Sequence, residues 1–210
     1  MAGSLQIQEQ LKEGFMQNPQ THYTSSQKKF APSIDKLAVH DHLCGLYETR
    51  AVQYERACNF VKTGLMRNEQ CVYVAEDILP SEFISLLQNE GVYAAAAKAN
   101  GSLHILTGHE LRSTLGGFTP DKMLCFLAQA EQKAKADGFS ALRWAAEMTW
   151  LQKDNIAAED FFSFETKLNV LLQELDIVAL CQYAKEDFKL ELLVAAAETH
   201  PIFVYEETAL

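Results

Sequence analysis

The sequence predicts an α/β fold, a three-layer sandwich in which a mainly parallel central sheet carries helices on both faces. Short apolar runs alternate along the chain with segments of helical periodicity, as in chains of repeated strand–helix units. Each run is almost continuously apolar, which is typical of strands covered on both sides. With 210 residues, 48% of them hydrophobic, the chain can bury one substantial core, so we expect one main domain over residues 39–210.

Six strands are predicted from the apolar runs. They cover residues 43–47, 71–75, 103–106, 141–146, 177–182 and 202–205, and each is bounded by polar or turn-forming residues.

The helices between these strands have recognisable ends. An apolar face repeats at helical spacing over 57–65, and a second helix opens at Pro80 and stops at Gly91. Thr119 is the expected N-cap of a third helix, with Pro120 in its first turn and its end at residue 138. Two more are predicted over 158–174 and 188–199, the last closed by Pro201. Because the crossovers pack back onto the sheet, the helices cover both of its faces.

Residues 1–38 have a different composition, rich in Gln, Ser, Lys and Thr. Only Ile7, Leu11 and Phe15 indicate a short amphipathic helix. We expect a mobile or partner-docking N-terminal arm here.

Charge and composition exclude several classes of protein. A net charge of −10 without a basic patch argues against direct nucleic-acid binding. The apolar runs stop well short of the roughly 20 residues of a membrane span, so we expect a cytoplasmic protein that does not enter a membrane. The five cysteines are odd in number and scattered, which argues against a disulfide framework and favours buried thiols.

A ring of polar and aromatic residues follows the predicted strand ends. In an open parallel sheet, ligands gather at this carboxyl edge, which makes the ring the candidate binding site. Its members are Tyr47, Glu48, Thr49, Glu76, Asp77, Thr107, Glu147, Thr149, Trp150, Gln182 and Tyr183.

Glu147 is the strongest single candidate, because it directly follows a buried strand and precedes Met148, Thr149 and Trp150. Partial burial would raise the pKa of this carboxyl unless a cation or a donor holds it charged, and Arg143 is the candidate partner. An equally weighted alternative is a structural carboxylate that pins a loop or caps a helix.

His42 and Cys44 lie two residues apart in a predicted strand and so point to one face. They would suit a soft transition metal, but two ligands are too few for a tight site, and we assign no metal ligand set. A capping histidine and a buried thiol are the simpler interpretation. The remaining histidines are expected to be satisfied hydrogen-bonding groups.

The junction after the first strand, Tyr47-Glu48-Thr49-Arg50-Ala51, has none of the glycines and no lysine of a phosphate-binding loop. Glu48 would repel a triphosphate there, which argues against an active NTPase. The helix N-terminus still offers free N–H groups for a small polar ligand.

Several segments resemble the MEDS domain, a sensory domain of methanogen, methylotroph and DcmR-type regulators. They are HLCGLYET, GLMRNEQCVYVAED, GFTPDKMLCFLAQA, GFSALRWAAEMTW, ETKLN, ALCQY and THPIFVYE, in this order over residues 42–206. The resemblance implies a RecA-like and KaiC-like core without the phosphate-binding loop, and a module that senses simple hydrocarbon derivatives. The family pattern falls on His42, Cys44, Tyr47, Gly64, Cys71, Tyr73, Asp77, Arg143, Glu147, Met148, Trp150, Glu165, Asn169, Cys181, Gln182, Tyr183, His200 and Pro201.

Together these observations predict a non-catalytic sensory domain that binds a small organic molecule at the carboxyl edge of the sheet. The expected ligand-binding residues are His42, Cys44, Tyr47, Asp77, Arg143, Glu147, Trp150, Gln182 and Tyr183. A glycine-containing loop over residues 107–118 is the candidate moving part. No cofactor is identified.

The output is expected through a protein partner or the N-terminal arm, because the printed chain carries no kinase or helix-turn-helix segment. The partner implied by the resemblance is a histidine kinase or a transcription regulator. A homo-oligomer is compatible with the fold. The alternatives are a metal or thiol redox sensor built on His42, Cys44 and Cys181, a degenerate ATPase fold kept as an interaction surface, and an active NTPase.

Overall fold

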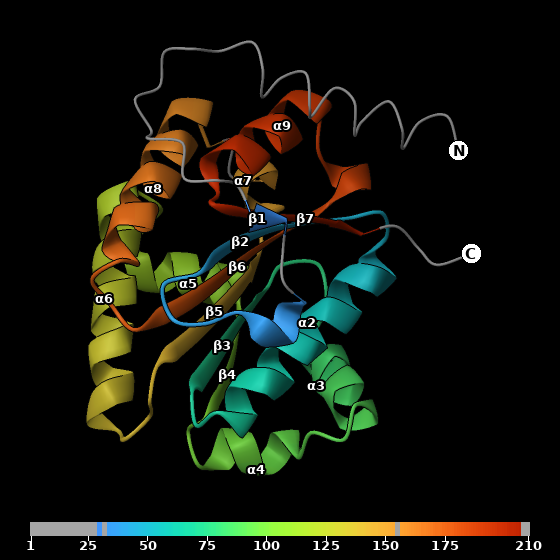
Figure 1. Ribbon diagram of the computed structural model, residues 1–210, viewed down its shortest axis with the longest axis vertical. Coiled ribbons are helices and arrows are strands. Elements are labelled where there is room, and N and C mark those ends of the chain that lie inside the picture. Colours follow the sequence, from blue (N-terminus) through green and yellow to red (C-terminus); the bar gives the residue numbers. More distant parts are fainter. Residues whose placement is uncertain (1–28, 31–32, 154–155, 207–210) are drawn as a thin grey trace.

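The computed structural model describes residues 29–30, 33–153 and 156–206, and it contains a seven-stranded parallel sheet (Figure 1). The strands lie in the order β1-β7-β2-β6-β5-β3-β4, and every neighbouring pair is parallel. Their bounds are β1 Lys29–Phe30, β2 His42–Tyr47, β3 Gln70–Ala75, β4 Leu103–Thr107, β5 Leu142–Glu147, β6 Ile177–Ala184 and β7 Ile202–Glu206.

Helices cover both faces of the sheet, so the α/β sandwich predicted from the sequence is confirmed. One face packs against 3-10 helix η1 (Ile34–Lys36), α2 (Arg50–Met66), α3 (Pro80–Asn89) and α4 (Ala94–Ala99). The other packs against α5 (Gly108–Leu115), α6 (Pro120–Ala136), α7 (Trp150–Lys153), α8 (Ala158–Leu171) and α9 (Leu190–Thr199), with η2 at Lys185–Asp187. Within the described part of the chain, no helix combines the length and apolarity needed to span a membrane.

All six strands and all five helices predicted from the sequence are present. Their ends differ by a few residues, except that α2 begins at Arg50, seven residues before the predicted apolar face. The Thr119 hydroxyl accepts a hydrogen bond from Lys122 N, so the expected N-cap of α6 is confirmed. Strand β1 and helices α4, α5 and α7 were not predicted, and each is short.

The expected loop over residues 107–118 is largely a helix, so that expectation is wrong. Thr107 and Glu110 form a capping box at the start of α5, and Gly116 closes it in the left-handed conformation with φ of 61°. The eight residues of α5 are too few for clear periodicity, whereas the glycines on both sides resemble loop residues.

The N-terminal arm is described only in part, because residues 1–28 and 31–32 lie outside the described ranges. Strand β1 pairs with β7, and η1 follows it. Leu37 is fully buried, and its carbonyl accepts a hydrogen bond of 2.5 Å from Arg67 Nη1. The stretch from 33 to 38 therefore packs against the domain, while the role of the preceding residues stays a prediction.

Side chains alternate between the two faces of each central strand. On β5, Trp144 and Ala146 enter the core beneath α5, α6 and α8, whereas Ala145 enters the core beneath α2 and α3. This alternation decides which of the candidate residues can meet.

Candidate functional site

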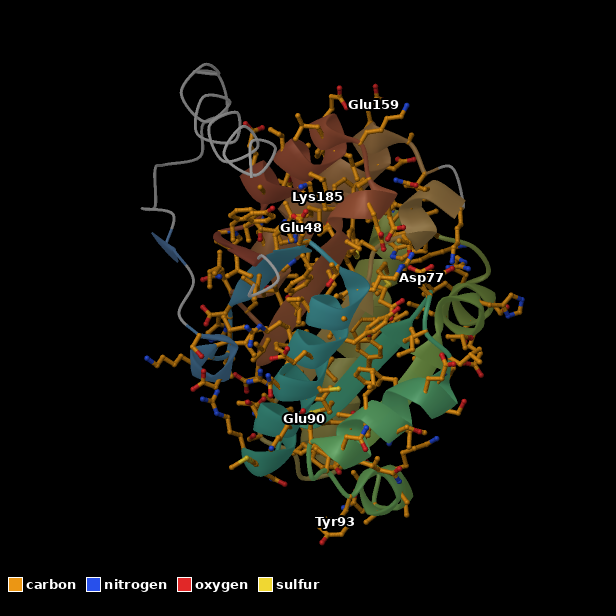
Figure 2. All side chains as sticks on the ribbon, turned by 90° about the vertical axis from the view of Figure 1, so that its right-hand side faces the viewer. Glu48, Asp77, Glu90, Tyr93, Glu159 and Lys185 are labelled. Carbon is orange, nitrogen blue, oxygen red and sulfur yellow. The ribbon has the colours of Figure 1, made fainter. Side chains whose placement is uncertain are left out.

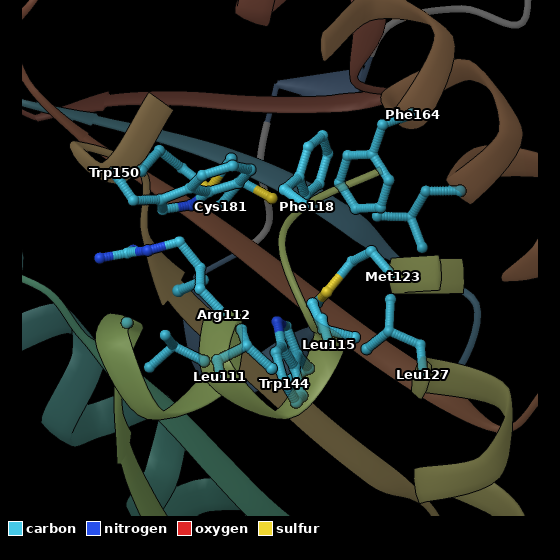
Figure 3. A pocket seen from close by; sticks show the side chains of 15 residues that line it. Leu111, Arg112, Leu115, Phe118, Met123, Leu127, Trp144, Trp150, Phe164 and Cys181 are labelled. Atoms are coloured by element: carbon cyan, nitrogen blue, oxygen red, sulfur yellow. The ribbon is translucent and has the colours of Figure 1, made fainter. Parts of the chain in front are cut away.

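A cavity of about 30 Å³ lies between the sheet and helices α5, α6 and α8, close to the carboxyl ends of β3 and β5 (Figure 3). Its wall is almost entirely hydrocarbon, aromatic or sulfur. The lining residues are Val74, Gly108, Leu111, Arg112, Leu115, Phe118, Met123, Leu127, Trp144, Ala146, Met148, Trp150, Phe164, Leu168 and Cys181.

Aromatic packing holds one side of the cavity together. The ring centroids of Phe118 and Trp150 lie 4.7 Å apart, and those of Phe118 and Phe164 lie 5.8 Å apart in an edge-on arrangement. Phe118 lies in the segment that connects α5 to α6, Trp150 is the first residue of α7, and Phe164 is on α8. Three separate segments thus meet around one aromatic cluster.

The cavity's cationic residue, Arg112, is paired away from the apolar wall. Arg112 Nη1 lies 2.9 Å from Glu76 Oε2, at the end of β3. A Cβ on Gly108 would clash with both side chains, coming within 2.7 Å of Arg112 Nη1. Glycine at position 108 therefore allows this ion pair to form against the start of α5.

Three carboxylates of the polar ring predicted at the carboxyl edge, Glu48, Glu76 and Asp77, are in internal ion pairs. Asp77 lies 2.9 Å from Arg50 Nη1 and 2.9 Å from Lys153 Nζ, and Arg50 Nη2 lies 2.9 Å from Asp187. Burial opposes ionisation of Asp77, but donors from Thr149, Lys153 and Arg50 outweigh it and lower the pKa. These carboxylates already have cationic partners.

Glu48, at the β2–α2 junction, also has its own partners. Tyr205 Oη donates to its carboxylate at 2.5 Å, and Lys185 Nζ lies 3.0 Å from Oε1. The Tyr205 hydrogen bond and then Lys185 lower the pKa of Glu48. Figure 2 shows Glu48 beside Lys185, with Asp77 farther along the same end of the molecule and Glu90 and Tyr93 toward the other end.

Glu147 is fully buried and holds the loop after β3. Tyr73 Oη donates to Oε1 at 2.6 Å, and the backbone N–H groups of Glu76 and Asp77 donate to Oε2 at 2.9 and 2.5 Å. Burial raises the pKa of Glu147, and these hydrogen bonds oppose the rise. The structural alternative considered for Glu147 matches this geometry.

Arg143 is not the partner of Glu147. It forms a buried ion pair with Glu69 near the amino ends of β5 and β3, and its guanidinium lies 4.5 Å above the Phe60 ring. Arg143 and Glu147 lie four residues apart on β5, so the two charges are near the amino and carboxyl ends of the same strand.

Tyr47 and Gln182 face α2, on the side of the sheet away from the cavity. Gln182 Nε2 donates to Gln53 O at 3.0 Å, and Tyr47 folds back over Gly45, where a Cβ would come within 2.6 Å of its ring. Both residues are buried.

His42, Cys44 and Tyr183 point to the same face as the cavity but are buried under α8 and α9. The metal-sensor alternative names His42, Cys44 and Cys181, and the structure brings two of these together. His42 Nε2 lies 3.5 Å from Cys181 Sγ and 3.4 Å from Glu165 Oε2.

The nine expected ligand-binding residues are therefore spread over both faces of the sheet and over both ends of its strands. Trp150 lines the cavity, and Asp77 meets Glu147 only through its backbone N–H. Met148 and Cys181 also line the cavity and belong to the family pattern. The lining residues on α5, α6 and α8 were not singled out, because Phe, Met and Leu at helical spacing are indistinguishable from ordinary core residues. Glu165 carried a signal that was not used, since it shares the buried face of α8 with Phe161 and Leu168.

Comparisons with known proteins agree with this architecture. The family model of the methanogen/methylotroph, DcmR sensory domain (MEDS) matches residues 41–201. The transcriptional repressor DcmR of Methylorubrum extorquens strain DM4 is 23% identical over 165 residues, which cover 78% of this chain and 59% of the repressor. A crystal structure of a KaiC-like protein from the archaeon Pyrococcus horikoshii OT3 has a TM-score of 0.61 at 14% identity, covering 86% of this chain and 79% of that chain.

Proposed function

The chain belongs to the MEDS family of sensory domains, and from this premise we propose that it is a non-catalytic sensor whose apolar cavity binds a small organic molecule. The observation that carries the proposal is the cavity under α5, α6 and α8. Ligand sites of this kind are apolar and largely formed in advance. The proposed site lies on one face of the sheet, next to the carboxyl edge at which the sequence placed it.

The size and the wall of the cavity indicate the class of ligand. By the same measure of volume a water molecule needs about 10–15 Å³, so a cavity of about 30 Å³ takes roughly two or three heavy atoms. An apolar wall favours a ligand with few polar groups, because such a ligand loses little hydration free energy on leaving water. A one- to three-carbon hydrocarbon derivative fits both conditions.

Helix α5 is the proposed moving part, because it covers the cavity and has a glycine at each end. Leu111 and Leu115 contribute to the wall, while Gly108 and Gly116 bound the helix. A ligand shifts the equilibrium between two positions of α5 only by its different affinity for them. The shift would change the surface offered to a signalling protein. The repressor relative, of which this chain covers 59%, suggests a transcription regulator as that partner, and a histidine kinase is the alternative.

The ligand site is tested by NMR of the full chain labelled with ¹³C at the methionine methyl groups. Met123 and Met148 line the cavity, whereas Met66 is 80% exposed and serves as an internal control. We expect saturable shifts of the Met123 and Met148 methyl signals on titration with dichloromethane, methanol or methylamine, and no shift at Met66. Unchanged signals with every probe, or equal shifts at all three sites, would contradict the proposed site.

A matched pair of variants assigns the response to the cavity. Leu127→Phe places a larger side chain in the cavity wall and should abolish the shifts. Val170→Phe introduces the same ring on α8, at a position that is 60% exposed, and should leave them intact. Identical behaviour of the two variants would place the ligand elsewhere.

The non-catalytic part of the proposal predicts no ATP turnover above the buffer background, measured as phosphate release by the full chain with Mg²⁺. Glu48 occupies the β2–α2 junction with Lys185 and Tyr205 as its partners. A phosphate-binding loop needs glycines and a lysine at that point. Measurable turnover that is abolished by Glu147→Gln would instead favour an NTPase.

A further inference from the structure

We propose that His42, Glu165, Cys181 and His200 bind one divalent transition-metal ion, with Zn²⁺ as the ion whose preferences they match. The proposal does not depend on the small-molecule site. Its thiol ligand is Cys181, whose Sγ lies 3.5 Å from His42 Nε2, rather than the Cys44 that lies two residues from His42 in the sequence.

The four residues come from four elements that the fold brings together on one face. His42 is on β2, Glu165 on α8 and Cys181 on β6, and His200 directly follows α9. Since His42 pairs in register with Ala179, Cys181 lies two residues along the neighbouring strand and on the same face. One donor atom from each residue lies within 4.8 Å of the other three, and all four side chains are buried.

Hydrogen bonds to the outer nitrogens fix the tautomers of both imidazoles. His200 Nδ1 lies 2.7 Å from Ala196 O, which can only accept, so this nitrogen carries the proton. Asn169 Nδ2 donates to Thr199 O at 2.7 Å, which turns Asn169 Oδ1 toward His42 Nδ1 at 2.8 Å as an acceptor. Each ring therefore presents the lone pair of its Nε2 to the cluster, as metal-bound histidines do.

The distances from Glu165 to the two imidazoles match ligands around a metal rather than hydrogen-bonded partners. Bonds of 2.0–2.3 Å to a tetrahedral ion separate its ligand atoms by about 3.3–3.8 Å. Glu165 Oε2 lies 3.4 Å from the Nε2 atoms of both His42 and His200. A hydrogen bond between a carboxyl group and an imidazole would bring the same atoms to about 2.7–2.9 Å.

The electrostatics of the cluster also favour a cation. Neither oxygen of Glu165 has a hydrogen-bond partner among the described residues, and its side chain is fully buried. One carboxylate, one thiolate and two neutral imidazoles balance the charge of a divalent ion, which removes the cost of burying the two anions.

Four protein ligands leave no open position on a tetrahedral ion, which is the pattern of a structural metal rather than a catalytic one. The ion would join β2, α8, β6 and the end of α9. Cys181 also lines the apolar cavity, so the metal-bound sulfur would form part of the cavity floor.

The test uses the tag-free full chain, stripped with a chelator and titrated with Co²⁺ under anaerobic conditions. We expect one equivalent to bind, with visible bands of tetrahedral Co²⁺ and a near-ultraviolet thiolate-to-cobalt band. Cys181→Ser should remove the thiolate band, while the matched control Cys44→Ser should keep it. No binding of Co²⁺ or Zn²⁺, or a thiolate band that survives Cys181→Ser, would overturn the proposal.

Metal coordination in the unmodified protein gives a result even if Cys181→Ser fails to fold. X-ray absorption of the zinc-loaded full chain should show one sulfur at about 2.3 Å and three nitrogen or oxygen ligands at about 2.0–2.1 Å. A shell without sulfur would rule out the cluster as the site. Because the Met123 and Met148 signals report the cavity separately, failure of either proposal is recognised without the other.

Discussion

Glu147→Gln is expected to lower the free energy of unfolding by about 3 kcal/mol, because the buried carboxylate accepts three hydrogen bonds and a neutral amide has a single, weaker acceptor oxygen. The amide has one acceptor oxygen, and its NH₂ group would face either Tyr73 Oη or the backbone N–H groups after β3. The result would be seen in urea unfolding of the full chain, monitored by circular dichroism.

Tyr73→Phe is the matched control for Glu147→Gln, since it removes one of the three donors and keeps the ring that stacks on Phe83 with centroids 3.8 Å apart. We expect a loss of about 2 kcal/mol for this change. If Glu147→Gln left the unfolding midpoint unchanged but abolished the Met123 and Met148 responses, Glu147 would be a ligand-binding residue, as the sequence suggested.

The strands were predictable because burial on both faces leaves a continuous apolar run. The run from Ile177 to Ala184 is β6, and both of its neighbours are strands that cross the same core. The helix ends were predictable where capping residues mark them, as Thr119 does for α6. Local physical chemistry was sufficient for these elements.

The candidate site was less predictable, because two-sided burial removes the alternation that tells one face of a strand from the other. Gln182 and Tyr183 are neighbours at the end of β6, yet Gln182 bonds to α2 while Tyr183 packs beneath α9. A list of strand-end residues therefore mixes two faces. The strand order, which decides the neighbours of each strand, is not written in any local motif.

The metal cluster illustrates the same limit over longer distances. His42, Glu165, Cys181 and His200 are separated by up to 158 residues. The parallel register of β2 and β6 aligns His42 with Cys181, and the packing of α8 and α9 over these strands adds Glu165 and His200. In the sequence the nearest thiol to His42 is that of Cys44, whereas in space it is Cys181 that meets the imidazole.

Glu69→Ala is expected to lower the free energy of unfolding by about 3–5 kcal/mol, because it leaves the guanidinium of Arg143 buried without its counterion. The Arg143 side chain has no exposed surface, and that of Glu69 is 6% exposed. A Cβ on Gly64 would come within 2.8 Å of Arg143 Nε, so the Arg143 side chain packs directly against the backbone of α2.

A double-mutant cycle decides between this structural role and the ligand-binding role that the sequence suggested for Arg143. Arg143→Met keeps an unbranched apolar chain over the Phe60 ring, and in Glu69→Ala/Arg143→Met no charge remains buried. The loss of unfolding free energy in the double variant should therefore be smaller than the sum of the two single-variant losses by about 2 kcal/mol, measured by urea unfolding. Additive losses would show that the pair is not coupled. An intact Met123 and Met148 response in the double variant would place Arg143 in the scaffold, since the ion pair lies at the opposite edge of the sheet from the cavity.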